Sequence, residues 1–266
     1  VQWLIMLHGK QIIPATMFGV ASGRKTQGHR FHSNGDIHIS SPITYAKTLE
    51  KKGFVIAEFN KRKNQIVDAV KQAAKKAGGK AVADDSLFNE VTGLTEWPVS
   101  ITGSFDSDFL ALPKEVIIAT LTTHQRYFPI SDTSDKLLPA FITLANLKSK
   151  EPDRVRLGNE RVIHVRLADA KFFWEMDQKV PLQNRGEMLK KIVYQQGLGT
   201  LHDQTMRLIA IAESLAKQLG INSKTIPRAA LLAKCDLVTG LVGEFPELQG
   251  TMGSYYARSS GETGDV

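Results

Sequence analysis

The strongest constraint on the fold is a change in hydrophobic periodicity along the chain. After Pro181, apolar residues recur every three or four positions, which is the spacing of one helical face. Between about residues 90 and 147, apolar residues instead alternate or form short runs bounded by turn residues, as in strands. We therefore expect an α+β chain, with a mixed α/β region over residues 1–180 and an all-helical region over residues 181–266.

The first region predicts a helix, a strand and a second helix in succession. Pro42 follows two serines and begins a helix that Gly53 ends. Residues 54–59 read as a strand, and an apolar stripe over residues 66–77, ended by two glycines, predicts the second helix.

A sheet is expected next, with strands at residues 99–102, 116–122 and 138–147. Residues 127–130 and 137–144 flank a polar turn and predict a hairpin. Later helices are expected to begin at Gly158, to run over residues 201–219 before Gly220, and to run from Pro227 through Val242.

Composition excludes several broad classes. Hydrophobic residues make up 42% of the 266 residues and charged residues 23%, so disorder and fibrous structure are not expected. The longest apolar runs fall far short of the roughly 20 residues that cross a bilayer, so we expect no membrane span. A single cysteine, Cys235, allows no intramolecular disulfide and favours the cytoplasm. The first residue is Val1 rather than methionine, and no signal-peptide pattern follows, so a piece of a longer polypeptide is expected.

Charge is concentrated in one segment. Residues 24–80 contain 13 basic and four acidic residues, a net charge of +9, whereas the whole chain carries +7 and the remainder therefore −2. Such a segment attracts polyanions, and interleaved aromatic residues such as Phe31 and Phe59 could stack on bases. An ordinary solvated helix face is the alternative, especially for the lysines at 71, 75 and 76.

Most enzyme motifs fit poorly. Residues 19–26 resemble a phosphate-binding loop, but the spacing is one residue short and Arg24 stands where the second glycine belongs. His202-Asp203 and Asp236 suggest a helical metal phosphohydrolase, yet no histidine follows His202, so a coincidence is favoured. Cys235 could be a reactive thiol beside Lys234, but a cysteine at an apolar helical position is more often a core residue.

The string from His124 to Pro129 combines an imidazole, a guanidinium and aromatic rings. Arg126 suits contact with a phosphate, and Tyr127 suits base stacking. Equally, Tyr127 could fill the core while Arg126 pairs with an acid.

Together these strings resemble the β subunit of the bacterial heterotetrameric glycyl-tRNA synthetase, in that family's order. The matching segments are residues 28–32, 103–106, 109–115, 124–129, 158–161, 166–170, 234–239 and 244–250.

The resemblance implies a subunit that helps to ligate glycine to tRNA. In that family the α subunit uses ATP with magnesium to make glycyl-adenylate, so no cofactor is expected in this chain. Expected partners are the α subunit and tRNA(Gly) in an α2β2 enzyme. Residues 1–180 would resemble the B3/B4-type domains of phenylalanyl-tRNA synthetase. Residues 181–266 would form an incomplete HD-like helical domain, with Cys235-Asp236 in place of the His-Asp doublet and no metal bound.

The leading hypothesis is therefore that this chain binds and positions tRNA, without a catalytic residue of its own. Alternatives are a metal-dependent phosphohydrolase of the HD type and a scaffold that docks the α subunit without touching tRNA. Charge and side-chain type select these candidate tRNA contacts: Arg24, Lys25, Arg30, His32, Lys61, Arg62, Lys63, His124, Arg126 and Tyr127.

Overall fold

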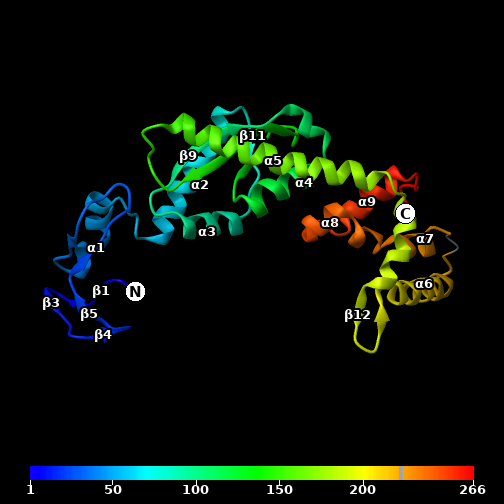
Figure 1. Cartoon of the computed structure of the whole chain (residues 1–266), viewed down its shortest axis with the longest axis horizontal. Helices are drawn as coiled ribbons and strands as arrows, with labels where there is room; N and C mark the ends of the chain where they lie inside the picture. Colours follow the sequence, from blue (N-terminus) through cyan, green and yellow to red (C-terminus); the bar gives the residue numbers. More distant parts are fainter. Residues whose placement is uncertain (222–223) are drawn as a thin grey trace. The chain divides into compact units, whose positions relative to one another are not determined.

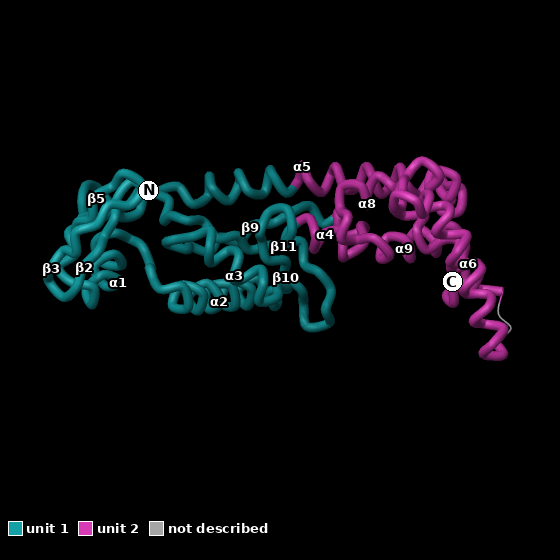
Figure 2. Tube along the Cα trace, turned by 90° about the horizontal axis from the view of Figure 1, so that it is seen from below, with its two compact units in different colours: residues 1–107, 121–163 teal, residues 108–120, 164–266 magenta. Residues whose placement is uncertain are grey.

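The computed structural model describes residues 1–221 and 224–266, which form two compact units of mixed helix and strand (Figures 1 and 2). Unit 1 contains residues 1–107 and 121–163, and unit 2 contains residues 108–120 and 164–266. The expected α+β class is confirmed. These units are defined by packing, and the assignment of residues 1–180 and 181–266 to separate family domains stays a prediction.

Unit 1 begins with short strands around a small apolar core. The core is formed by Ile37, Ile39 and Leu49. Strands β1 and β5 pair in parallel. The other three pairs, β4 with β5, β2 with β3, and β6 with β7, are antiparallel. The bounds are β1 Leu4–Ile5, β2 Leu7–His8, β3 Gln11–Ile12, β4 Thr16–Met17, β5 Val20–Gly23, β6 Lys25–Thr26 and β7 Ile37–His38.

The helix expected from Pro42 to Gly53 is confirmed, as three consecutive helical turns. These are η1 (Pro42–Thr44), α1 (Tyr45–Thr48) and η2 (Leu49–Gly53). The strand expected over residues 54–59 is wrong. Phe54 adopts a left-handed φ of 53°, which turns the chain out of η2, and helix α2 (Phe59–Lys76) begins five residues later.

Unit 1 is centred on a four-stranded antiparallel sheet in the order β8-β10-β11-β9. Strands β10 (Phe128–Ser131) and β11 (Leu137–Ala145) form the expected hairpin, and β9 (Val99–Ser104) confirms the strand expected at residues 99–102. The short edge strand β8 (Lys80–Ala81) follows α2.

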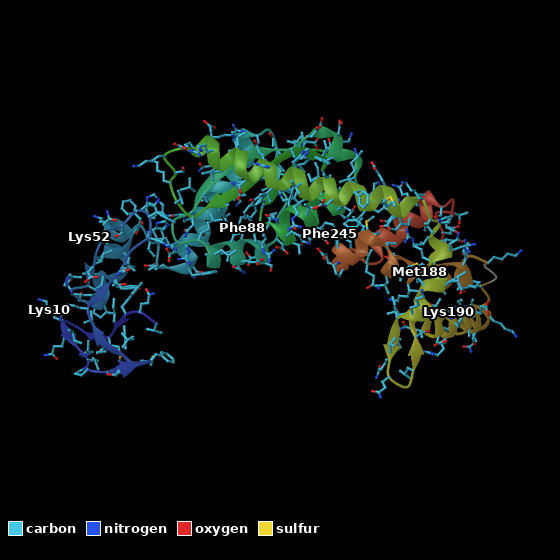
Figure 3. The ribbon with its side chains drawn as sticks, viewed as in Figure 1. Lys10, Lys52, Phe88, Met188, Lys190 and Phe245 are labelled. Carbon is cyan, nitrogen blue, oxygen red and sulfur yellow. The ribbon has the colours of Figure 1, made fainter. Side chains whose placement is uncertain are left out.

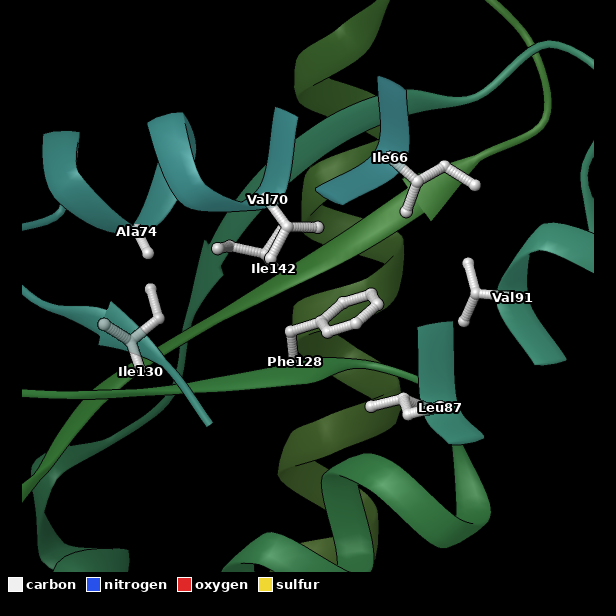
Figure 4. Close-up of a cluster of buried hydrophobic side chains, with 8 residues drawn as sticks. All are labelled: Ile66, Val70, Ala74, Leu87, Val91, Phe128, Ile130 and Ile142. Atoms are coloured by element: carbon white, nitrogen blue, oxygen red, sulfur yellow. The ribbon is translucent and has the colours of Figure 1, made fainter. Parts of the chain in front are cut away.

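Two helices cover one face of this sheet (Figure 4). Helix α2 and helix α3 (Asp85–Leu94), which Asp84 caps, bring apolar side chains onto those of the sheet. The packed set is Ile66, Val70 and Ala74 from α2, Leu87 and Val91 from α3, and Phe128, Ile130 and Ile142 from the sheet. The apolar stripe over residues 66–77 is thus the buried face of α2, as expected.

The strand expected over residues 116–122 is wrong. Pro113 instead precedes helix α4 (Lys114–Ala119), which continues into η4 (Thr120–His124). Val116, Ile117 and Leu121 are at most 1% exposed, so this run is apolar because it is buried on several sides. A continuous apolar run of this length does not distinguish a buried strand from a buried helix.

Helix α5 runs from Pro152 to Gln178, so it begins six residues before the expected Gly158. Proline is favourable in a first helical turn, where its missing N–H is not needed. Residues of α5 up to Ile163 belong to unit 1, and those from His164 belong to unit 2.

Unit 2 is mostly helical but contains a small hairpin that the sequence did not predict. The expected helix before Gly220 is confirmed as α6, whereas the helix expected from Pro227 to Val242 is broken into three pieces because Thr239 caps a new helix. The bounds are η3 Ser107–Ala111, η5 Leu182–Lys191, β12 Val193–Gln195, β13 Gly199–Thr200, α6 Leu201–Gln218, α7 Thr225–Leu232, η6 Cys235–Val238, α8 Gly240–Glu244, η7 Pro246–Leu248 and α9 Thr251–Ser259.

Asp177 organises the interior of unit 2. Its buried carboxylate accepts hydrogen bonds from the backbone N–H groups of Gly240 and Leu241, each at 2.9 Å, and from the Tyr256 hydroxyl at 2.9 Å. Arg185 completes the set with an ion pair at 3.1 Å. The end of α5 is thereby joined to η5, α8 and α9.

Among the described residues, no helix is long and apolar enough to cross a membrane.

We predict that Phe128→Ala lowers the free energy of unfolding by about 3–5 kcal/mol, because this ring is fully buried between the sheet and its two helices. Chemical denaturation measures the change. Phe18→Ala is the control: this ring is 80% exposed, so we expect a change within about 0.5 kcal/mol. Equal effects of the two substitutions would contradict the described core.

Candidate nucleic-acid interface

A buried histidine fastens the N-terminal strands to the rest of unit 1. His29 is 2% exposed, and its backbone N–H donates to the Gly53 carbonyl at 2.6 Å. Its Nε2 bonds to the Asn146 carbonyl, and its Nδ1 accepts from the Phe31 N–H at 3.2 Å. Since a carbonyl only accepts, Nε2 is the donor in the bond to Asn146. We call the contacts among His29, Gly53 and Asn146 the histidine joint.

Asn146 and Gly28 complete the joint. The side-chain oxygen of Asn146 accepts from the backbone N–H groups of Glu96 at 2.6 Å and Trp97 at 2.9 Å. A Cβ on Gly28 would lie 2.4 Å from the Gly53 Cα, so the two backbone segments approach as closely as only glycine permits. The segment from Gly28 to His32 therefore has a structural role.

His32, a predicted tRNA contact, is also engaged within this region. Its ring stacks on His29 with centroids 4.8 Å apart and lies 5.4 Å from the ring of Phe54. Its Nε2 accepts a hydrogen bond from the Lys148 N–H at 2.9 Å. A contact of His32 with RNA stays a prediction, and its visible role is packing.

Three of the predicted lysines form ion pairs on the surface. Lys25 lies 3.1 Å from Asp36, Lys61 lies 2.6 Å from Glu50, and Lys63 lies 2.5 Å from Asp85. The hydrogen bond from Lys63 lowers the pKa of the Asp85 carboxyl. Exposed pairs of this kind contribute little to stability, so an incoming phosphate can compete for the ammonium groups.

The predicted arginines differ in how far they are available. Arg62 donates from Nε to the Thr92 carbonyl at 3.0 Å and from Nη1 to the Ile56 carbonyl, so its guanidinium holds the start of α2 to neighbouring backbone. The visible role of Arg62 is structural, and its contact with tRNA stays a prediction. Arg24 donates to the Lys10 carbonyl at 2.8 Å. Arg30 is exposed and lies over the Phe31 ring, with Cζ 5.8 Å from its centroid.

Two lysines outside the predicted set line a cavity together with Lys61 and two glutamates. This cavity of about 410 Å³ lies between helix α1, η2 and the segment leading into α2, and it is lined by Ala46, Lys47, Glu50, Lys51, Ile56, Ala57, Glu58 and Lys61. Lys47 and Lys51 are four residues apart, which places them on one helical face. That spacing was the sequence signal that could have identified them. We call this cavity the lysine groove. The next residue of η2 after Lys51 is Lys52, which is labelled in Figure 3.

The string from His124 to Tyr127 is divided between surface and core. Arg126 has a left-handed φ of 60° and its Nε pairs with Glu90. Tyr127 is 8% exposed, its ring stacks on Phe141 at 5.1 Å, and its hydroxyl donates to Asn159. Burial raises the pKa of the Tyr127 hydroxyl. The burial of Tyr127 fits the alternative that this ring fills the core, and a contact of Tyr127 with tRNA stays a prediction.

The residues at the HD-like position are used within unit 2. Asp236 is fully buried, and its Oδ2 accepts from the backbone N–H groups of Gly250 at 2.6 Å and Gly253 at 3.0 Å, at the start of α9. The Cys235 thiol donates to the Leu231 carbonyl at 3.4 Å. Burial, followed by the neighbouring Asp236 carboxylate, raises the pKa of this thiol to about 11.

The remaining motif matches have local explanations. Asp203 accepts from the backbone N–H and the hydroxyl of Thr200, both at 2.8 Å, which forms a capping box at the start of α6. This accounts for the His202-Asp203 pair. Over residues 1–221 and 224–266, no group of three or more His, Cys, Asp or Glu side chains is placed to hold a metal ion. Residues 19–26 occupy strands β5 and β6 and their flanks instead of opening a helix, so they do not form a phosphate-binding loop.

Comparison with known proteins identifies the family. The model of the glycyl-tRNA synthetase beta subunit family matches residues 1–266. The chain belongs to this family. It is 47% identical over 267 residues to the glycine–tRNA ligase beta subunit of Marinobacter nauticus, covering 100% of this chain and 38% of that protein. The corresponding values are 47%, 97% and 37% for the Coxiella burnetii protein, and 44%, 100% and 39% for one from Neisseria meningitidis. Family membership thus confirms the resemblance, although the chain spans 38% of the length of the first of these relatives.

We predict that Cys235 reacts slowly with iodoacetamide at pH 8. A thiol whose pKa is raised to about 11 is almost entirely protonated at pH 8. Its thiolate fraction at pH 8 is about 100-fold lower than that of a thiol with the ordinary pKa near 9. Alkylation followed by mass spectrometry should therefore be at least about 100-fold slower in the folded chain than in denaturant. Similar rates in the two states would contradict the buried position of the thiol.

Proposed function

We propose that this chain is part of the β subunit of a glycine–tRNA ligase, in which it binds tRNA(Gly) and positions it for ATP-dependent glycylation at an active site on the α subunit. The observation that carries the proposal is the family match over all 266 residues. The names of the relatives, glycine–tRNA ligase beta subunit, supply the reaction.

The lysine groove is the proposed site for the RNA backbone. Its ammonium groups come from two separate segments, since Lys47 and Lys51 lie on α1–η2 and Lys61 lies on α2. Lysines arranged in this way bind phosphates as point charges, without reading the base sequence. Arg30 and Lys25 extend the positive surface on the strand side of unit 1. Phosphate contacts of this kind would fix the position of the tRNA.

Positioning is the proposed contribution to catalysis. Holding the acceptor arm still turns the meeting of the terminal adenosine with the adenylate into an effectively unimolecular step. ATP and magnesium would be held by the α subunit, and no residue of this chain is proposed to contact them. We further propose an α2β2 enzyme in the cytoplasm.

We also propose that residues 181–266 are the start of an HD-like helical domain that has no metal-dependent hydrolytic activity. Its support is the use of Asp236 as a cap for α9 and the thiol of Cys235 at the neighbouring position. Asp236→Ala should destabilise unit 2 without changing metal content. Stoichiometric manganese or zinc that is lost with Asp236 would overturn this assignment.

A scaffold role is the second candidate, favoured by exposed apolar residues on α6. Ile211 and Leu215, four residues apart and therefore on one face of this helix, are each at least 50% exposed. Such a face suits the α subunit as a partner. Co-elution with the α subunit in the absence of tRNA would support this role, which is compatible with tRNA binding.

We predict that the double variant Lys47→Gln/Lys51→Gln binds tRNA(Gly) more weakly and with a shallower salt dependence. Each phosphate contact that is lost should reduce the slope of log K against log salt by about 0.7–0.9. Fluorescence anisotropy across several salt concentrations measures both quantities.

The matched control is Lys71→Gln/Lys75→Gln, which removes two exposed lysines of the same spacing from α2. We expect it to change the slope by less than half as much. Equal slopes for the wild-type chain and the groove variant would show that the lysine groove is not the tRNA contact.

A further inference from the structure

A second cavity of unit 1 has a different lining from the lysine groove. It measures about 730 Å³ and lies next to the histidine joint, with Gln2, Trp3, Gln27, Arg30, Tyr45 and Glu96 among its lining residues. A smaller cavity of about 480 Å³ shares Trp3, Thr26 and Tyr45 with it. Volumes of this size are typical of sites for small molecules and for single nucleotides.

Two aromatic residues line this cavity, together with the aliphatic side chains of Leu49 and Val55. Trp3 is 41% exposed and Tyr45 is 38% exposed, so part of each residue remains open for contact with a ligand. Aromatic side chains in such positions stack on unpaired nucleobases, and this stacking tolerates any base because each has a π face.

The polar part matches the remaining groups of a nucleotide. The amides of Gln2 and Gln27 can both donate to and accept from a base edge, and the carboxylate of Glu96 accepts hydrogen bonds. Arg30 supplies a cation for a phosphate. None of the ion pairs formed by the described residues includes Arg30, so no carboxylate among these residues neutralises its charge.

The cavity is joined to the lysine groove by one helical segment. Tyr45 lines the cavity, and Lys47 and Lys51, two and six residues later, line the groove. Because residues two positions apart on a helix do not face each other, the cavity and the groove open on different sides of this segment. A single RNA strand can place an unpaired base against Tyr45 in the cavity, with its phosphate at Arg30. A base-paired strand cannot, because its bases are stacked within the duplex.

We propose that this cavity, the aromatic cavity, binds an unpaired nucleotide of RNA, with its base against Trp3 and Tyr45 and its phosphate at Arg30. The inference rests on the proposed function and adds to it the class of RNA that unit 1 recognises, which is an unpaired strand.

The test compares two labelled probes on the 266-residue chain by fluorescence anisotropy: a six-nucleotide single-stranded RNA, and a blunt RNA duplex of the same length. We expect the single strand to bind at least tenfold more tightly. Trp3→Ala and Tyr45→Ala should each weaken it by at least fivefold, Tyr45→Phe should retain binding, and Phe18→Ala, an exposed ring outside the cavity, should leave it unchanged.

A measurement on the unmodified chain avoids any effect of the substitutions on folding. A single-stranded RNA that carries one 4-thiouridine is photo-crosslinked, and the modified peptide is identified by mass spectrometry. Crosslinks to Trp3 or Tyr45 are expected, and crosslinks confined to other peptides would overturn the proposal.

The outcomes separate this inference from the proposed function. If whole tRNA binds through the lysine groove but single strand and duplex bind equally, the aromatic cavity is not a nucleotide site and the proposed function stands. If neither whole tRNA nor the single-stranded RNA binds at low salt, both proposals fail.

Discussion

The arrangement of unit 1 depends on the histidine joint. The N-terminal strands pair within small two- and three-stranded sheets, and the contacts that tie them to the rest of unit 1 include hydrogen bonds from His29 to Gly53 and Asn146. Asn146 in turn holds the backbone of Glu96 and Trp97 through its side chain. Because these bonds are buried, losing one partner leaves an unsatisfied polar group and costs about 1–3 kcal/mol.

Both proposed RNA sites depend on this joint. Three separate segments bring Arg30, Tyr45 and Glu96 to the aromatic cavity. Gly53 ends η2, which carries Lys51 and directly follows Lys47 and the rest of α1. His29 and His32 therefore act by positioning other residues, whereas Arg30 between them is exposed. Charge and side-chain type alone made His32 a candidate contact, but its ring packs against His29 and Phe54.

The sequence predicted elements whose periodicity has one interpretation. Helix α6 and the hairpin of β10 and β11 follow directly from spacing and turn residues. Residues 116–122 could not be assigned in this way, because a run buried on several sides has no exposed face to reveal its period. For the site, the sequence located the basic segment but not the Asp85 carboxylate that pairs with Lys63 or the Thr92 carbonyl that accepts from Arg62, since these partners lie 22 and 30 residues away.

The central claim is that RNA contacts unit 1 along the segment from β6 to the start of α2. Hydrogen exchange with and without a tRNA(Gly) transcript tests it directly at peptide resolution. The account predicts slower exchange over residues 26–61 and no change in α6. Protection confined to residues 201–266, or no protection at low salt, would contradict it.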